Sequence, residues 1–240
     1  MKLVDRYLAG EREAVWDEIY DLPVTSATRA EVEVVADETM RRVHANLVRI
    51  VQRLDAQTFL FHSRETALRP PSARVDATLR CIDEKTSELV IDGLRGQPLA
   101  PSVRAFYRQV GSVNLTGYSH RWPQPIPISA QHGAPYFLGD GLFVHSVDEL
   151  LLAAEEIPAG SSNLGFSPDI FHKEDVSGGP PYSFDIVSPS LDAFCTIIET
   201  AFVPYLRWSI LKWGGFPGLR LYRNIPQAWI NELIEDLEPF

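Results

Sequence analysis

The spacing of apolar residues predicts helices in the first part of the chain. Apolar side chains recur at helical intervals on either side of Gly10, which predicts two short helices within roughly the first twenty residues. A longer apolar stripe from Val32 to Leu54 predicts one long helix. Thr28 and Glu31 have the spacing of a capping box, so we expect the long helix to begin there.

Shorter elements are predicted after residue 100. Pro101 suits the first turn of a short helix, and Gly111 is placed to end it. Ser146 and Glu149 form a second capping box, ahead of a helix over residues 147–157. Strands are predicted at residues 142–144, 163–167 and 182–187, and the last two flank a long loop as a hairpin would.

The end of the chain has a helical pattern. Apolar residues are spaced for one buried face from Leu191 to Trp213, and Pro204 is expected to divide this stretch into two helices. A final helix is predicted over residues 226–237. Helices and short strands in this order predict an α+β fold.

One break in the pattern predicts a domain boundary. Pro70 and Pro71 adjoin small and polar residues, which is typical of a boundary or hinge. We therefore expect an N-terminal helical extension over residues 1–68 and an α+β domain over residues 69–240.

The charge balance narrows the choice of partner. The chain has 32 acidic and 22 basic residues, a formal net charge of −10, which opposes binding to nucleic acid or to an anionic membrane surface. Such a surface suits a basic protein partner, although acidity also serves solubility alone. The first residues lack the pattern of a signal peptide, and no apolar stretch approaches the ~18 residues of a membrane helix. Cys81 and Cys195 are therefore expected to be core thiols in a cytoplasmic protein.

No segment carries a strong catalytic, metal-binding or nucleotide-binding motif. The six histidines lack the spacing that places two imidazoles on one helical face, and the serines at 161, 162 and 177 lack the flanking glycines of a nucleophile elbow. Four loop residues have side chains that a divalent ion accepts, although a solvated hairpin loop is the commoner explanation: Asp169, His172, Glu174 and Asp175. We predict neither a metal nor a cofactor.

Two polar loops are the candidate binding surfaces. The segment from Tyr118 to Trp122 combines two aromatic rings, an imidazole and a guanidinium, which are typical of binding hot spots. Trp122 is explained equally well as a core anchor. The candidate partner-binding residues are Tyr118, His120, Arg121, Trp122, His172, Glu174 and Asp175.

Three segments occur in an order known from one protein group. The run from Pro98 to Leu115 contains a proline-led helix with a Phe-Tyr pair, then a glycine and a strand. Tyr-Ser-Phe-Asp at 182–185 and Phe-Val-Pro-Tyr-Leu at 202–206 follow. Over roughly residues 76–220 the chain thereby resembles the SUKH superfamily, which includes bacterial immunity proteins and the domain of a yeast cell-wall assembly regulator. The resemblance implies a SUKH-like domain, with a curved, mainly antiparallel sheet flanked by helices, that works by binding another protein. Because many immunity members neutralise nuclease toxins, it also implies a basic toxin as the partner.

These observations lead to a main hypothesis and an alternative. The main hypothesis is a non-enzymatic protein-interaction domain of the immunity type. The alternative is a hydrolase-like enzyme that uses the loop around His172 and Asp175, together with His120 or His132. A small-molecule site with the Tyr118 to Trp122 loop as one wall is a third interpretation.

Overall fold

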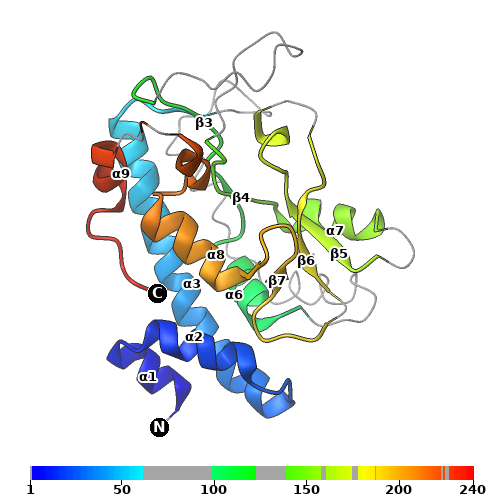
Figure 1. The fold of residues 1–240 in the computed structure, drawn as a ribbon. Helices are drawn as coiled ribbons and strands as arrows, with labels where there is room; N and C mark the ends of the chain where they lie inside the picture. The colour runs from blue at the N-terminus through cyan, green and yellow to red at the C-terminus, as the bar shows by residue number, and fades with distance from the viewer. Residues whose placement is uncertain are drawn as a thin grey trace.

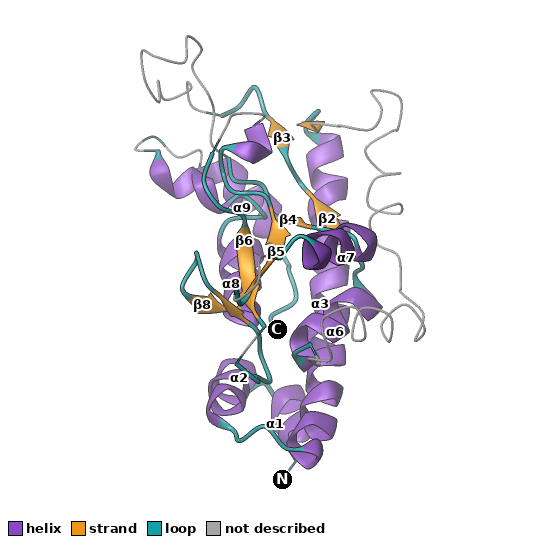
Figure 2. Cartoon of the chain, turned by 90° about the vertical axis from the view of Figure 1, so that its right-hand side faces the viewer, coloured by secondary structure: helices purple, strands orange, loops and turns teal. Residues whose placement is uncertain are grey.

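A long helix, α3 (Ser26–Ala56), is the element on which most other helices pack (Figure 1). The computed structural model describes residues 2–61, 99–122, 139–157, 161–174, 178–186, 188–222, 224 and 227–240. Helices are combined with small antiparallel sheets, so the predicted α+β class is confirmed (Figures 1 and 2). Within the described ranges, no helix has the length and apolar character needed to cross a membrane.

Two short helices precede α3, as the sequence predicts. They are α1 (Leu3–Ala9) and α2 (Arg12–Asp21), and Gly10 joins them in the left-handed conformation, with a φ of 112°, that glycine adopts without strain. Tyr7 and Trp16 are buried, and the indole N–H of Trp16 donates a 3.0 Å hydrogen bond to the hydroxyl of Thr39 on α3. These two helices therefore share the core with α3.

The start of α3 differs from the prediction. Its capping box is formed by Thr25 and Thr28, because the Thr25 hydroxyl accepts from the Thr28 amide and the Thr28 hydroxyl accepts from the Thr25 amide. The predicted pair of Thr28 and Glu31 is wrong, since a threonine at the third position can fill the role assigned to glutamate. Glu31 accepts the backbone N–H of Leu3 instead, at 2.8 Å, and so ties α1 to α3.

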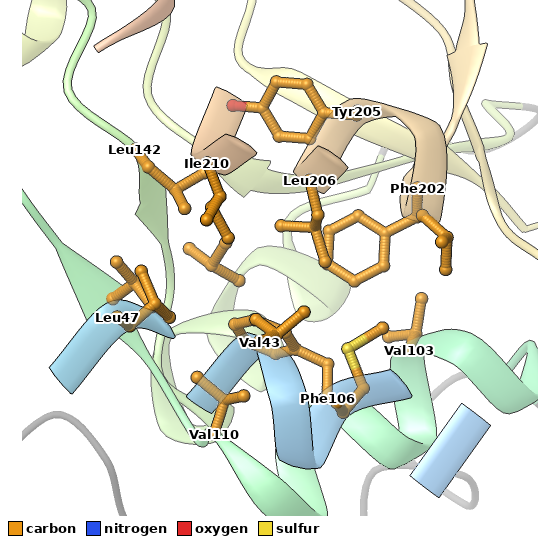
Figure 3. Packing of buried hydrophobic residues seen from close by; sticks show 14 of the residues in the cluster. Val43, Leu47, Val103, Phe106, Val110, Leu142, Phe202, Tyr205, Leu206 and Ile210 are labelled. Carbon is orange, nitrogen blue, oxygen red and sulfur yellow. The ribbon is translucent and has the colours of Figure 1, made fainter. Parts of the chain in front are cut away.

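The core lies between α3, α6 and α8. Helix α6 (Pro101–Gln109) begins at Pro101 and is followed by Gly111 at a φ of 89°, as expected. Figure 3 shows side chains of α3 and α6 meeting those of α8 (Phe202–Arg207) and of the π-helical turn that continues it (Trp208–Lys212). The buried residues labelled there include Val43, Leu47, Val103, Phe106, Val110, Phe202, Leu206 and Ile210.

The main sheet has four described strands in the order β5, β6, β7, β8, with antiparallel pairing throughout. They are β5 (Asn163–Ser167), β6 (Tyr182–Asp185), β7 (Phe194–Cys195) and β8 (Thr200–Ala201). The predicted hairpin is confirmed, since Leu164 pairs with Phe184 across β5 and β6. Phe166 and Phe184 stack at 4.2 Å between ring centroids, and both contact Phe202, so this aromatic group joins the sheet to α8.

Two further strand pairs connect the helices to the sheet. Strand β1 (Leu60–Phe61) pairs with β3 (Gly117–Tyr118), and β2 (Val113–Asn114) pairs with β4 (Phe143–Val144). Helix α7 (Val147–Glu155) follows β4 and packs against β5 (Figures 1 and 2). Its capping box of Ser146 and Glu149 is confirmed.

The stretch from residue 191 to residue 213 is not helical throughout, which corrects the prediction. Its first part forms β7 and β8, and Glu199 in the turn between them has a φ of 54°. Helix α8 begins only at Phe202, so Pro204 lies in its first turn, where a missing N–H costs nothing, and does not divide a helix.

The end of the chain lies along α3. Helix α9 (Gln227–Ile234) packs on α3, and the residues after it are anchored because Asn46 donates to the carbonyl of Glu238 and accepts its N–H. One hydrophobic cluster runs from Leu3 to Phe240 through the described residues. The predicted boundary between residues 68 and 69 lies outside those residues, and the helices before it belong to this cluster.

Candidate functional site

The loop after β5 holds an aspartate and a histidine in contact. Asp169 is buried, accepts the N–H of Phe171 at 2.8 Å, and is hydrogen-bonded to Nδ1 of His172. Burial of the Asp169 carboxyl opposes its ionisation, but the hydrogen bonds from His172 and from Phe171 outweigh it, so the pKa of Asp169 lies below its ordinary value. Gly178 packs directly on this carboxyl, since a Cβ there would lie 2.3 Å from Oδ1.

A buried ion pair lies next to this Asp–His dyad. The ammonium of Lys173 is 2.7 Å from Oδ1 of Asp140, and the hydroxyl of Tyr182 is 3.3 Å from both carboxylate oxygens. Lys173 also lies over the Tyr182 ring, 4.8 Å from its centroid. Burial and the neighbouring Asp140 raise the pKa of Tyr182. All these groups are satisfied by one another, which is the arrangement expected of a structural pair.

The chemistry available to these residues is proton transfer. An aspartate on one imidazole nitrogen is the arrangement that orients a general base, and the His172 side chain is 47% exposed, so a substrate could reach it. Nearby hydroxyls are committed to the backbone, because Ser167 donates to the carbonyl of Pro168 and Ser183 donates to that of Pro181. The thiol of Cys195 is buried, and burial raises its pKa well above the ordinary value.

The predicted ligands of a divalent ion are only partly placed. The structure brings Asp169 and His172 together, whereas Asp175 lies outside the described residues and the side chain of Glu174 is not described. Over the described residues, no group of three or more His, Cys, Asp or Glu side chains could hold a metal ion.

The segment from Tyr118 to Trp122 is the second candidate binding surface. Trp122 is 4% exposed and its indole packs edge-on against the rings of Phe59, Phe216 and Trp229. Next to it, Arg121 donates to Glu232 at 3.0 Å and His120 is exposed. Trp122 therefore occupies a core position, and Arg121 and His120 are the members of this segment that face solvent.

The contacts given for the two predicted surfaces involve different residues. Arg121 donates to Glu232 and Trp122 packs against Trp229, whereas His172 bonds Asp169 and Lys173 pairs with Asp140. A hollow elsewhere, at the start of α6, is lined by residues that include Arg29, Val103, Phe184 and Ser188. None of the predicted site residues lines this hollow.

The arginines of α3 and α6 are bound within the molecule. Arg104 pairs with Glu33 at 2.9 Å and Arg108 pairs with Asp37 at 2.7 Å, so acidic residues of α3 are neutralised by α6. The row of arginines on α3 holds the end of the chain. Arg41 and Arg49 pair with Glu238, Arg42 donates to the carbonyl of Pro239, and Arg53 donates to that of Leu233.

Helix α7 has a different charge environment. Its exposed acidic residues are Asp148, Glu149, Glu155 and Glu156, and no basic residue lies in its last turn. Glu149 caps the helix, and His145 and the Ser146 amide lower the pKa of Glu149 to about 2. The side chains of Asp148, Glu155 and Glu156 form no ion pair or hydrogen bond with the described residues. Their charges are therefore left to solvent or to a partner.

Sequence reasoning missed the buried pair and the charge environment of α7. Asp140 and Lys173 are 33 residues apart, and the only local signal was the glycine on each side of Asp140. No protein-family model, curated protein or solved structure matches this chain. The function must therefore be argued from the residues themselves.

Proposed function

We propose that this chain is a non-enzymatic protein-interaction domain that binds a basic protein partner. The observation that supports the proposal is the distribution of charge over the described residues. The arginines of α3 and α6 are held by internal carboxylates and carbonyls, whereas Asp148, Glu155 and Glu156 at α7 form no ion pair with the described residues. Together with the formal net charge of −10, this leaves a surface that attracts cationic partners and repels nucleic acid.

The resemblance to SUKH proteins suggests what the partner does. Immunity members of that group bind toxins, so we propose that the partner is a basic toxin that the chain neutralises. The buried free thiol of Cys195 agrees with a reducing compartment, and the same proposal places the protein in the cytoplasm.

A pull-down with the tagged full-length chain tests the proposal. The bait is incubated with extract of the native host and washed at moderate salt, beside an unrelated protein of similar negative charge as the control. We expect one basic protein in stoichiometric amount on the chain and not on the control, and we expect its activity to fall when the chain is added. A chain that retains nothing beyond the control would refute the proposal.

The Asp169–His172 dyad supports a second candidate function, a hydrolase-like enzyme with His172 as general base. Its test is a screen of ester, amide and phosphoester substrates with the wild type and the His172→Ala variant. Turnover that falls at least about a hundredfold in the variant would support the enzyme. Turnover that is absent, or equal in both proteins, would exclude this role for His172.

A further inference from the structure

Leu152 lies at the centre of the solvent-facing side of α7. It is 60% exposed, and side chains three and four positions away on a helix are its nearest surface neighbours. All four of those positions carry a carboxylate, namely Asp148, Glu149, Glu155 and Glu156. We call these five residues the α7 acidic face.

Helix stability explains only two of the five residues of this face. Asp148 and Glu149 lie in the first turn, where negative charge interacts favourably with the helix dipole. Glu149 also completes the capping box with Ser146. These two residues would be expected on a helix with no partner.

Glu155 and Glu156 do not stabilise the helix. Glu155 is the last helical residue and Glu156 is the C-cap, where the dipole disfavours negative charge. Leu152 exposes a large apolar side chain between them and the first turn. The two glutamates thus oppose the helix dipole, and on the helix surface they are the neighbours of the exposed Leu152.

We propose that the α7 acidic face is the docking surface for a basic segment of a protein partner. Lys or Arg side chains of that segment lay their methylene stems on Leu152 and place their charges among the surrounding carboxylates. This inference rests on the proposed function, and it locates the contact on α7, away from the loops that contain Tyr118 and His172.

The lack of internal ion pairs at three of these carboxylates favours a cationic partner. Asp148, Glu155 and Glu156 have no internal cation among the described residues, so no ion pair has to break when a partner binds. On α3 the situation is the reverse, because Glu33 and Asp37 are already paired with Arg104 and Arg108. Asp148, Glu155 and Glu156 are therefore the residues among these that can meet external cations.

A labelled basic peptide provides the test. The probe is a helical peptide of about 15 residues with leucines on one side and lysines around them, and a peptide with glutamates in place of the lysines is its control. Fluorescence anisotropy measures binding to the full-length chain at about 50 mM and at about 500 mM salt.

Two surface variants and two matched controls locate the contact. We expect Leu152→Ala and the double variant Glu155→Gln/Glu156→Gln each to weaken binding of the basic peptide by about tenfold. Leu8→Ala removes an equally accessible leucine on α1, and Glu235→Gln/Asp236→Asn removes the same charge after α9. Both controls should stay within about twofold of the wild type.

Each outcome decides the inference. Three results would overturn the inference that the α7 acidic face is a docking surface. They are no binding of the basic peptide, equal binding of both peptides, and equal losses of affinity in variants and controls. A partner captured from extract and held equally by the wild type and by Leu152→Ala would also overturn it, while the proposed function would stand. Weaker peptide binding in the α7 variants alone would support the inference. If no partner were then captured from extract, that result would count against the proposed function only.

Discussion

The ammonium group of Lys173 lies 2.7 Å from Oδ1 of Asp140, and both side chains are almost entirely shielded from solvent. The pair joins the Gly-Asp-Gly segment at 139–141 to the short 3-10 helix (His172–Glu174) that follows β5. Neither charge is stable at this depth without the other, because an isolated charge in a protein interior loses its hydration without compensation. The loop that carries His172 is thus held in place by a neighbouring residue.

Loss of the lysine should therefore destabilise the fold strongly. Lys173→Met keeps the aliphatic stem and leaves Asp140 charged and buried, so we expect the free energy of unfolding to fall by about 3–5 kcal/mol. Urea denaturation measures this. Adding Asp140→Asn to Lys173→Met removes the uncompensated charge and should restore part of the loss. A loss below about 1 kcal/mol in the single variant would contradict a buried pair.

Asp192 should make the protein less stable as the pH rises. A carboxylate paired with a cation does the reverse, because its stabilisation is lost as the pH falls. Burial raises the pKa of Asp192 to about 7, although the N–H of Val203 and the hydroxyl of Ser102 partly offset it. The native state therefore binds a proton that the unfolded state releases, and this stabilisation is lost as pH rises from about 4 to about 7.

The matched variant is Asp192→Asn, which keeps an oxygen to accept the Val203 N–H. Relative to the wild type, its free energy of unfolding should improve by roughly 1 kcal/mol per pH unit between about pH 5 and about pH 7. Thermal or urea unfolding of both proteins across this range measures the difference. A constant difference would show that Asp192 is ionised throughout in the native state.

Asn46 should control the anchoring of the end of the chain. Its buried amide makes two hydrogen bonds to the backbone of Glu238, at 2.7 and 2.8 Å. Asn46→Ala should lower the free energy of unfolding by about 1–3 kcal/mol and abolish the hydrogen-exchange protection of the Glu238 amide. The control is Asn231→Ala on α9, an exposed residue whose side chain accepts a hydrogen bond from Gln227, which should cost at most about 0.5 kcal/mol. Unchanged protection at Glu238 would show that Asn46 does not hold this segment.

Trp122 should contribute to the stability of the fold and not to partner binding. Trp122→Ala leaves a void between Phe59, Phe216 and Trp229 and should cost about 3–5 kcal/mol, while Trp122→Phe fills most of the space and should cost less. Partner binding by the folded Trp122→Phe variant should stay within about twofold of the wild type. A loss of more than about tenfold with unchanged stability would make Trp122 a binding hot spot instead.

Elements with local signals were predictable from the sequence. Ser146 and Glu149 are neighbours along the chain, and their reciprocal hydrogen bonds require nothing from the rest of the fold. The β5–β6 hairpin was predictable because its strands alternate and are joined by one loop. By contrast, β7 and β8 have two residues each, too few to establish a period, and the apolar Ile197 that suited a helix is 48% exposed in the turn between them.

The candidate sites were less predictable, because they depend on contacts between distant segments. Asp169 and His172 are three positions apart and were grouped from the sequence, but the neighbouring Lys173 is neutralised by Asp140, which is 33 residues away. The acidic residues of α3 and α7 look alike in sequence. Only the fold shows that Arg104 and Arg108 reach Glu33 and Asp37, whereas no described cation reaches Glu155 or Glu156.

The contacts between α3 and the end of the chain also affect how the protein is made. Asn46 meets Glu238 across 192 positions of sequence, and Arg53 meets the carbonyl of Leu233 across 180. Contacts this distant in sequence form late and slow folding. During synthesis the helix that organises the core thus emerges long before the residues near Glu238 that pack along it. Until those residues emerge, Arg49 and Arg53 of this helix lack the partners that they have in the fold.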